Sequence, residues 1–441
     1  MKKKIVCVLL GMMMALGTTA CGGDQLSSSS VNLNEGYEGK QTEQEELPDT
    51  EQETGDIEDE EMPEEGTTEV TFSSGYADFS VTMLKNTAKP GTNTMISPLS
   101  ILTALTMTEN GAAGETLTQM EEVLFGGMPV AQQNEELTAY ISSLPDTEKC
   151  HMNQANSIWV KNSNGTLAIR EEFLQKNADT FDADIYSAPF DAQTLKDINT
   201  WVARETDNMI PQMLNQIDPT TVMYLINAVA FEAEWQSPYG DYQVRDSEFY
   251  QENGGSETVE MMYSEEHRYL EDADTTGFIK PYKEGYSFVA LLPKDGMSME
   301  DYLDGLTGEK YMALMENQGI GVTVDTGLPK FTSEYTAELK DILAEMGMPL
   351  AFDEWNADFS GIGSCGDGNL YISMVLHKTY VSVDELGTKA GAATAVAMNE
   401  ATAVMPEEPK RVILDRPFVY AIVDNENYLP VFIGVVETVE K

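Results

Sequence analysis

The hydrophobic pattern predicts helices early in the chain and strands later. Apolar residues recur at helical spacing over residues 99–107 and again over 117–124. Ser97 and Pro98 precede the first run, where a serine can cap free amides and a proline loses no hydrogen bond. Glycines at 111 and 114 separate the two runs. We therefore expect two consecutive helices, the first capped by Ser97.

Extended apolar stretches dominate the rest of the chain, without the regular alternation of strand and helix that a parallel α/β fold needs. They cover residues 157–160, 221–235, 288–292, 371–384, 418–423 and 431–436. This order favours an α+β fold. Residues 222–235 and 371–384 would make two strands spanning roughly 46 Å each, about twice an ordinary strand. A sheet with such strands could receive another of the same length.

The N-terminus has the features of an export signal. Three lysines precede an apolar run at residues 5–16, and small residues lead to Cys21. The run is too short to remain as a membrane-spanning helix. Cys21 after small residues resembles a bacterial lipobox, which implies a diacylated thiol, although Thr18 stands where leucine is preferred. Residues 1–20 are thus predicted to be a signal peptide. Plain cleavage after Ala20, leaving a soluble protein, is the alternative.

Residues 21–69 are predicted to be the lipid-anchor cysteine and a disordered acidic tether. From Asp24 to Glu69 there are 17 acidic residues and one lysine, Lys40. Such a segment repels itself and has little apolar surface to bury. Residues 70–441 are long enough for one large core and are predicted to be a single domain. The expected location is the cell surface, on a bacterial membrane.

The charge and the cysteines exclude several kinds of function. The formal net charge of −49 at pH 7 argues against nucleic acid and anionic lipid, so the membrane is expected to be reached only through the anchor. Cys150 and Cys365 in the domain could form one bridge or remain two thiols. Their spacing suggests no metal site, and no cofactor is expected.

Seven short fragments in a fixed order carry a resemblance to a known family. They are residues 93–100 (NTMISPLS), 111–120, 227–235, 328–331 (LPKF), 358–361 (DFSG), 375–378 (VLHK) and 416–418 (RPF). Together they resemble the serpin family over nearly all of residues 70–441, with Glu232 and Ala233 standing where Lys-Gly is usual. The resemblance implies a monomer with a large central mixed sheet, two smaller sheets, eight or nine helices and an exposed reactive-centre loop.

Residues 383–396 resemble the hinge of the inhibitory members. Its key positions are Glu385, Gly387, Thr388, Ala390, Gly391, Ala392, Ala393 and Thr394. A loop that becomes a buried strand must present one uncharged face. Alternate positions from Thr388 to Met398 carry no charge, and no proline interrupts residues 388–405. Leu386 and Lys389 depart from the family's acidic residues. An Ala-rich helix or flexible loop is the alternative.

The resemblance implies a suicide-substrate mechanism, in which a protease is trapped as a covalent acyl complex when the cleaved loop inserts into the sheet. The protein itself would not be an enzyme. Counting seventeen residues from Glu385 places the reactive bond at Ala401-Thr402, with 403–404 and 404–405 as alternatives. Counting back from Arg416 points instead to 405–406, a poor bond because proline follows it. Residues 390–409 contain no Lys or Arg, which favours elastase-like or subtilisin-like targets, or papain-like cysteine proteases.

The resemblance also assigns two supporting groups of residues. A buried polar cluster called the shutter would contain Ser97, Ser100, Asn227 and His377. The breach, where the loop first inserts, would contain Trp235, Lys330 and Glu385. We hypothesise an ion pair between Lys330 and Glu385.

Two other functions compete with inhibition. A surface lipoprotein hydrolase would need a nucleophile motif, but residues 361–366 (GIGSCG) have the wrong register for a Gly-x-Ser-x-Gly elbow, and no His-Glu metal motif occurs. A non-inhibitory binding protein with the same fold is the stronger alternative, because trapping depends on insertion outrunning deacylation.

Overall fold

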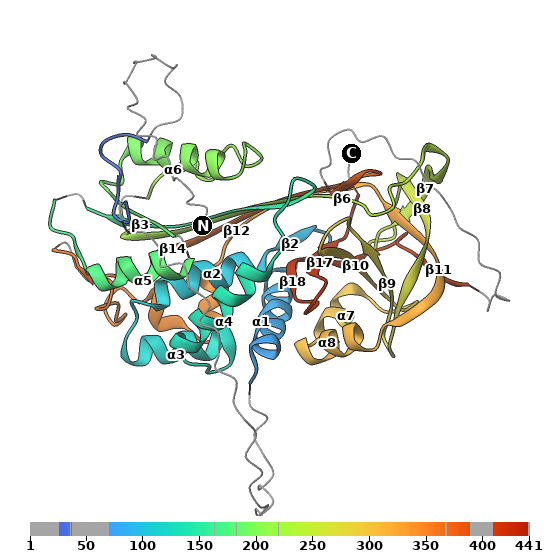
Figure 1. Cartoon of the computed structure of the whole chain (residues 1–441), viewed down its shortest axis with the longest axis horizontal. Helices are drawn as coiled ribbons and strands as arrows, with labels where there is room; N and C mark the ends of the chain where they lie inside the picture. The colour runs from blue at the N-terminus through green and yellow to red at the C-terminus, as the bar shows by residue number, and fades with distance from the viewer. Residues whose placement is uncertain are drawn as a thin grey trace, which may run out of the picture.

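The computed structural model describes residues 26–35, 37, 70–388 except 163, 182, 219 and 367, and 409–439. Within them the chain forms three sheets with helices packed around them, which confirms the α+β prediction (Figure 1). One of the three is a large mixed sheet.

The large sheet has seven strands, in the order β1-β5-β3-β6-β15-β14-β12. Their bounds are β1 Val31–Asn32, β3 Cys150–Lys161, β5 Asp184–Ala188, β6 Met223–Glu234, β12 Phe331–Glu338, β14 Met374–Val383 and β15 Gly387–Thr388. The central strands β6 and β14 pair directly and in parallel, from Tyr224 opposite Met374 to Ala230 opposite Tyr380.

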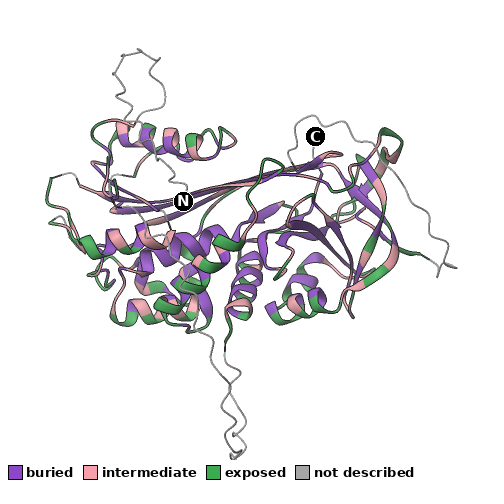
Figure 2. Ribbon diagram, viewed as in Figure 1, coloured by how far each residue is buried: buried purple, intermediate pink, exposed green. Residues whose placement is uncertain are grey.

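Both faces of this sheet are covered, α6 lying on one side and α2 to α5 on the other (Figure 1). In β6, Leu225 and Val229 belong to the larger core on the α2 side, whereas Tyr224 and Ile226 belong to the smaller core under α6. The first nine residues of β6 are therefore all buried (Figure 2). A strand that is dry on both faces has a continuous apolar sequence, which is why the sequence predicted it clearly.

The two predicted helices are α2 and α3, and further helices lie before and after them, three of them between residues 299 and 346. The helices are α1 Phe72–Thr87, α2 Pro98–Glu109, α3 Gly114–Phe125, α4 Val130–Ser143, α5 Glu171–Phe181, α6 Ala192–Glu205, α7 Met299–Gly305, α8 Gly308–Glu316 and α9 Lys340–Met346. Ser97 caps α2 by accepting the amide of Ser100 at 3.3 Å, and Pro98 is its first residue. This confirms the predicted start of the first helix.

The second sheet has nine strands, so it is not the smaller sheet that the family resemblance implied. Its strands are β2 Thr94–Ile96, β7 Val244–Tyr250, β8 Ser256–Glu271, β9 Thr275–Pro281, β10 Tyr286–Pro293, β11 Gly319–Pro329, β16 Lys410–Ile413, β17 Phe418–Asp424 and β18 Pro430–Val436. The 16-residue strand β8 pairs with β7, β9 and β11, and so joins what would otherwise be two sheets. The third sheet contains only β4 (Ala168–Ile169) and β13 (Gly363–Ser364).

The two long strands are shorter than the predicted 14 residues each: β6 has 12 residues and β14 has 10. At one end Trp235 leaves the ladder, because its amide donates to the carbonyl of Leu386. At the other end Ser373 precedes β14 and is bonded to the start of β6, its amide donating to the carbonyl of Met223. Apolar composition alone could not separate these flanking residues from the strands.

Part of the predicted tether is folded, which corrects the expectation of disorder throughout residues 21–69. Strand β1 pairs antiparallel with β5, Val31 lying opposite Ser187. Ser27 and Ser30 each donate a 2.5 Å hydrogen bond to Asp197 of α6. The docked stretch, residues 26–35, precedes the dense acidic run, so it lacks the self-repulsion on which the prediction rested. It also covers the free backbone edge of β5.

Two further expectations concern the membrane and the cysteines. In the parts of the chain that the structure describes, no helix combines the length and apolar character needed to cross a membrane. Cys150 and Cys365 are free thiols, the first buried and the second partly exposed. Of the two alternatives, the structure has two free thiols and no disulfide between Cys150 and Cys365. Cys21 lies outside the described residues.

We predict that Ser30→Ala loosens the docked N-terminal stretch. Burial favours the neutral form of Asp197, but hydrogen bonds from Ser27 and Ser30 hold the pKa of its carboxyl below the usual value. A hydrogen bond to such a charge contributes about 1.5–3 kcal/mol. Hydrogen exchange of residues 26–35 should therefore accelerate in Ser30→Ala. The exposed Ser28 provides the matched control: Ser28→Ala should leave exchange unchanged, and equal effects of both variants would contradict the assignment.

Candidate functional site at one end of the large sheet

The candidate site lies where β6 and β14 stop pairing. Past Ala230 and Tyr380 the two strands separate, and the chain following β14 turns back between them as β15. Thr388 pairs antiparallel with Val383 of β14 and with Ala233 of β6. The first two residues of a strand are thus already seated between β6 and β14.

Gly387 and Thr388 fit this position for different reasons. A Cβ on Gly387 would lie 2.0 Å from the carbonyl oxygen of Ala233, so only glycine allows the close backbone approach. Thr388 is fully buried, and its hydroxyl lies 2.5 Å from the hydroxyl of Tyr282. Thr388 is thus buried at the position where the predicted inward face begins. The other small hinge residues and the predicted reactive bond lie outside the described residues: Ala390, Gly391, Ala392, Ala393, Thr394, Ala401 and Thr402.

The turn before β15 is held by three hydrogen bonds from one short segment, residues 235–239. The Trp235 indole donates to the carbonyl of Asp384 at 2.8 Å, and its amide donates to the carbonyl of Leu386 at 2.9 Å. The amide of Tyr239 donates to the carbonyl of Glu385 at 2.9 Å. We call residues 384–387 the loop root, and residues 235–239 the clamp. Sequence reasoning identified Trp235 but missed Tyr239.

The hypothesised ion pair is present beside the loop root. Lys330 Nζ lies 2.9 Å from Glu385 Oε2 and 3.4 Å from Glu260 Oε1. Burial by itself would raise the pKa of Glu385, but the hydrogen bond from Lys330 holds it below the usual value. The side chains are 23% and 38% exposed, and a partly solvated pair of this kind contributes about 1 kcal/mol or less.

The four residues that resemblance assigned to the shutter lie together midway along the sheet. Asn227 of β6 donates to the carbonyl of Ser100 at 2.7 Å and also contacts the Ser100 hydroxyl. His377 of β14 accepts the amide of Ser97 at 3.1 Å and contacts the Asn227 side chain through Nδ1. Asn227 and His377 are register partners across the seam between β6 and β14.

Asn156 of β3 belongs to the same cluster and was missed. Its side-chain oxygen accepts from Asn227 and lies 3.3 Å from the Ser100 hydroxyl. The sequence placed the start of this strand at residue 157, because the polar residues from His151 to Asn156 interrupt the apolar pattern. β3 in fact begins at Cys150. In the structure Asn156 lies opposite Asn227, and a predicted strand that began before residue 157 would have included it.

His377 is held neutral, since complete burial lowers its pKa to about 3. Both ring nitrogens have partners: Nε2 accepts from Ser97, so Nδ1 carries the proton and donates to Asn227. A buried imidazole with both nitrogens occupied has no free lone pair for catalysis. Its role is to join β14 to α2 and β6.

Nothing in the described part of the chain supports the hydrolase alternative. Ser364 lies in β13, which pairs with β4, and the chain then makes a bridge from Cys365 to Gly368 rather than starting a helix. A nucleophile elbow needs a strand-to-helix turn. Among the described residues, no group of three or more His, Cys, Asp or Glu side chains could hold a metal ion.

Comparison with known proteins gives a consistent result. Residues 74–439 match the family model described as Serpin (serine protease inhibitor). A serpin-like protein of Thermococcus kodakarensis is 32% identical, with 81% of this chain and 83% of the relative covered. The leukocyte elastase inhibitor of Equus caballus is 31% identical, with coverage of 82% and 98%. The crystal structure of the thermophilic serpin Tengpin in its native state has a TM-score of 0.82 and 42% identity, covering 93% of this chain and all of that one.

We predict that Lys330→Ala loosens the loop root more than Glu260→Gln does. The first variant removes the 2.9 Å pair with Glu385, and the second removes only the 3.4 Å contact. Lys330→Ala should lower Tm by about 2 °C and accelerate hydrogen exchange of residues 384–388. Glu260→Gln should do neither measurably. Unchanged exchange in Lys330→Ala would show that the pair does not hold the loop root.

We predict that His377 makes the protein less stable in acid. With a folded pKa of about 3 and an unfolded value near 6.5, only the unfolded chain binds the proton between these limits. The free energy of unfolding should therefore fall by about 1.4 kcal/mol for each pH unit below about 6.5, from this residue alone. Denaturant melts between pH 7 and 4 give this free energy at each pH, and in His377→Gln it should fall less steeply as the pH is lowered. The exposed His267 supplies the control, His267→Gln, which should keep the original slope.

Proposed function

Because this chain belongs to the serpin family, whose members are mostly protease inhibitors rather than enzymes, we propose that it is a single-use trap for a target protease. The observation that carries the proposal is β15, seated between β6 and β14 with Thr388 buried. A loop that begins in this position can lengthen the existing strand without first making a new site. The alternate positions after Thr388 carry no charge, which favours further extension of β15 between β6 and β14.

In the proposed mechanism, the nucleophile of the protease attacks the carbonyl carbon of the reactive bond. The peptide C–N bond breaks, a new amino terminus leaves, and an acyl-enzyme remains on the upstream half of the loop. That half then extends β15 between β6 and β14. The acylated protease is carried along the sheet, and its distorted site cannot complete hydrolysis of the ester or thioester.

Insertion must open the seam at the buried polar cluster. A strand placed between β6 and β14 separates them by one further strand spacing, about 4.8 Å. Asn227 and His377 contact each other across that seam, so their hydrogen bond has to break. The ladder between β6 and β14 is lost as well, but the inserted strand forms two ladders in its place. This net gain of hydrogen bonds provides a driving force for insertion.

We propose Ala401-Thr402 as the reactive bond and an elastase-like or subtilisin-like protease as the target, papain-like cysteine proteases being the second class. The small side chain of Ala401 suits a shallow specificity pocket. A trypsin-like pocket needs a basic residue, and residues 390–409 contain none. Among the relatives, the horse and cattle proteins named leukocyte elastase inhibitor support this class.

We further propose that the protein acts as a secreted monomer, anchored to the outside of a bacterial membrane through Cys21. Four residues separate Cys21 from Leu26, where the docked stretch starts. A lipid on Cys21 would therefore hold the α6 side of the domain within about 18 Å of the membrane. The acidic run would then follow the docked stretch instead of spacing the domain from the anchor.

The proposed function predicts a covalent complex with elastase. The chain from residue 22 onward is mixed with pancreatic elastase and examined on denaturing gels, with mass spectrometry of the released peptide. We expect a complex that survives denaturant and a C-terminal peptide beginning at Thr402. Complete cleavage without a complex would contradict trapping of this protease and favour a binding role. The human thyroxine-binding globulin, 25% identical with a TM-score of 0.73, shows that role on the same fold.

The position of the reactive bond can be tested by changing which protease the loop inhibits. Ala401→Arg should convert the protein into a trypsin inhibitor, because trypsin cleaves after arginine. Ala403→Arg is the matched control, since trypsin would cut two residues later and leave a loop of the wrong length for efficient trapping. If Ala403→Arg instead traps trypsin more efficiently, the bond lies at 403–404.

A further inference from the structure

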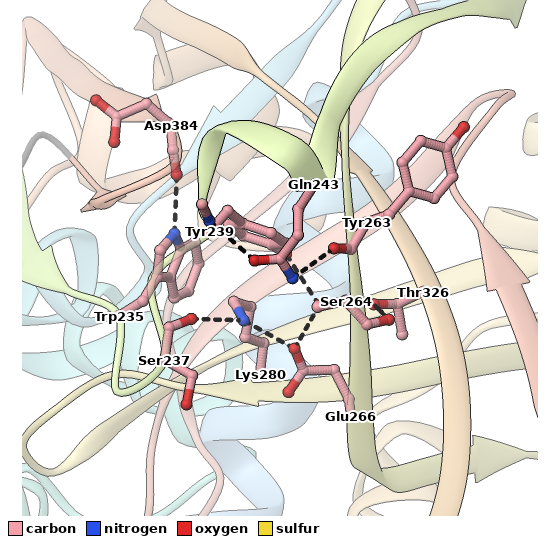
Figure 3. Close-up of polar contacts among 11 residues, drawn as sticks. Trp235, Ser237, Tyr239, Gln243, Tyr263, Ser264, Glu266, Lys280, Thr326 and Asp384 are labelled. Carbon is pink, nitrogen blue, oxygen red and sulfur yellow. Dashed lines mark hydrogen bonds and ion pairs between the residues drawn. The ribbon is translucent and has the colours of Figure 1, made fainter. Parts of the chain in front are cut away.

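A buried ion pair lies directly beneath the clamp. Lys280 of β9 and Glu266 of β8 are 1% and 7% exposed, and Lys280 Nζ lies 2.7 Å from Glu266 Oε1 (Figure 3). Removing two charges from water is costly, and apolar residues of similar size often stabilise a core equally well. The pair therefore needs an explanation beyond stability.

The Lys280 ammonium lies close to three of the five clamp residues, Trp235, Ser237 and Tyr239. The ammonium donates to the carbonyl of Ser237 at 3.2 Å, in the middle of residues 235–239. The same nitrogen lies 4.3 Å from the ring centre of Tyr239 and 5.4 Å from that of Trp235, within the range of cation–π attraction. Trp235 and Tyr239 are the two clamp residues that donate hydrogen bonds to backbone carbonyls of the loop root.

Glu266 fixes the ammonium to the second sheet. Besides Lys280, its carboxylate accepts a 2.6 Å hydrogen bond from Ser264 of β8. The Ser264 hydroxyl also lies 3.0 Å from that of Thr326 on β11 (Figure 3). One cation is thus tied to β8 and β11 on one side and to the clamp on the other.

We propose that Lys280 and Glu266 are a positioning pair that keeps the clamp on the loop root and so restrains insertion of the uncleaved loop. This rests on the proposed function, because the restraint has a purpose only if the loop inserts. The clamp continues directly from β6, and β14 leads directly into the loop root. Separating β6 from β14 over their full length therefore requires the clamp to move relative to the loop root, and the ammonium opposes that movement.

The first test variant is Lys280→Met, which keeps an unbranched side chain of similar length but removes the hydrogen bond and both ring contacts. Loss of a charge-assisted hydrogen bond corresponds to about ten- to a hundredfold in a local opening equilibrium. Hydrogen exchange of residues 235–239 and 384–388 should accelerate by that factor. Lys310→Met is the matched control, because Lys310 is about half exposed and pairs at 3.6 Å with Asp274.

A second variant separates positioning from simple stability. Lys280→Met alone leaves Glu266 buried without its cation, so Tm should fall. In the double variant Lys280→Met with Glu266→Leu no buried charge remains, and Tm should recover. Hydrogen exchange at the clamp and loop root should nevertheless stay fast, because no ammonium contacts Ser237. If exchange returns to the original rate together with Tm, the pair only stabilises the core and the proposal is wrong.

These exchange measurements use the intact chain from residue 22 onward and no protease, so they stand whether or not an inhibitory complex forms. The consequence for insertion is measured separately. The uncleaved double variant and Lys310→Met are incubated at 37 °C, and the fraction that becomes inert to elastase is followed on gels. Faster inactivation of the double variant alone is expected. Equal rates, despite faster exchange at the clamp, would show that the pair does not restrain insertion.

Discussion

The direct parallel pairing of β6 with β14 is the constraint on which the rest of this structure depends. The first nine residues of β6 are buried on both faces, whereas β14 is buried on the α2 side and only partly covered on the side of α6. A strand can join the sheet there only in extended form, and only if its side chains suit a dry environment on at least one face. The composition of residues 388–398 meets this condition.

Three groups of contacts hold the seam closed, and they differ in kind. Midway along it, His377 and Asn227 join the strands to each other and to α2. At the end where β15 is seated, backbone hydrogen bonds from the clamp hold the loop root, and the partly exposed pair of Lys330 and Glu385 adds a modest electrostatic contribution. Beneath the clamp, the pair of Lys280 and Glu266 is almost completely buried. The contacts thus act at two places, midway along the seam and at the end where β15 is seated.

The opposite edge of the large sheet is finished by a segment from far away in the chain. β1 covers the backbone of β5, and Asp197 ties the same stretch to α6. An uncovered edge strand can pair with another molecule, so this contact also protects the sheet. It depends on a short stretch with a single acidic residue, Glu35, that precedes a long acidic run, and the overall composition of residues 21–69 does not show that difference.

The sequence by itself determined the elements whose signals are local. Ser97 before an apolar helix, the continuous apolar run of β6 and the uncharged alternation from Thr388 each reflect burial or capping within a few residues. The pair of Lys330 and Glu385 was also anticipated, through resemblance. Only the tertiary structure placed Asn156 in the polar cluster, joined Lys280 to Glu266 beneath the clamp and docked residues 26–35 on β5 and α6. The physical reason is that a polar residue is recorded in the sequence as hydrophilic, whereas its burial depends on partners that distant strands bring to it.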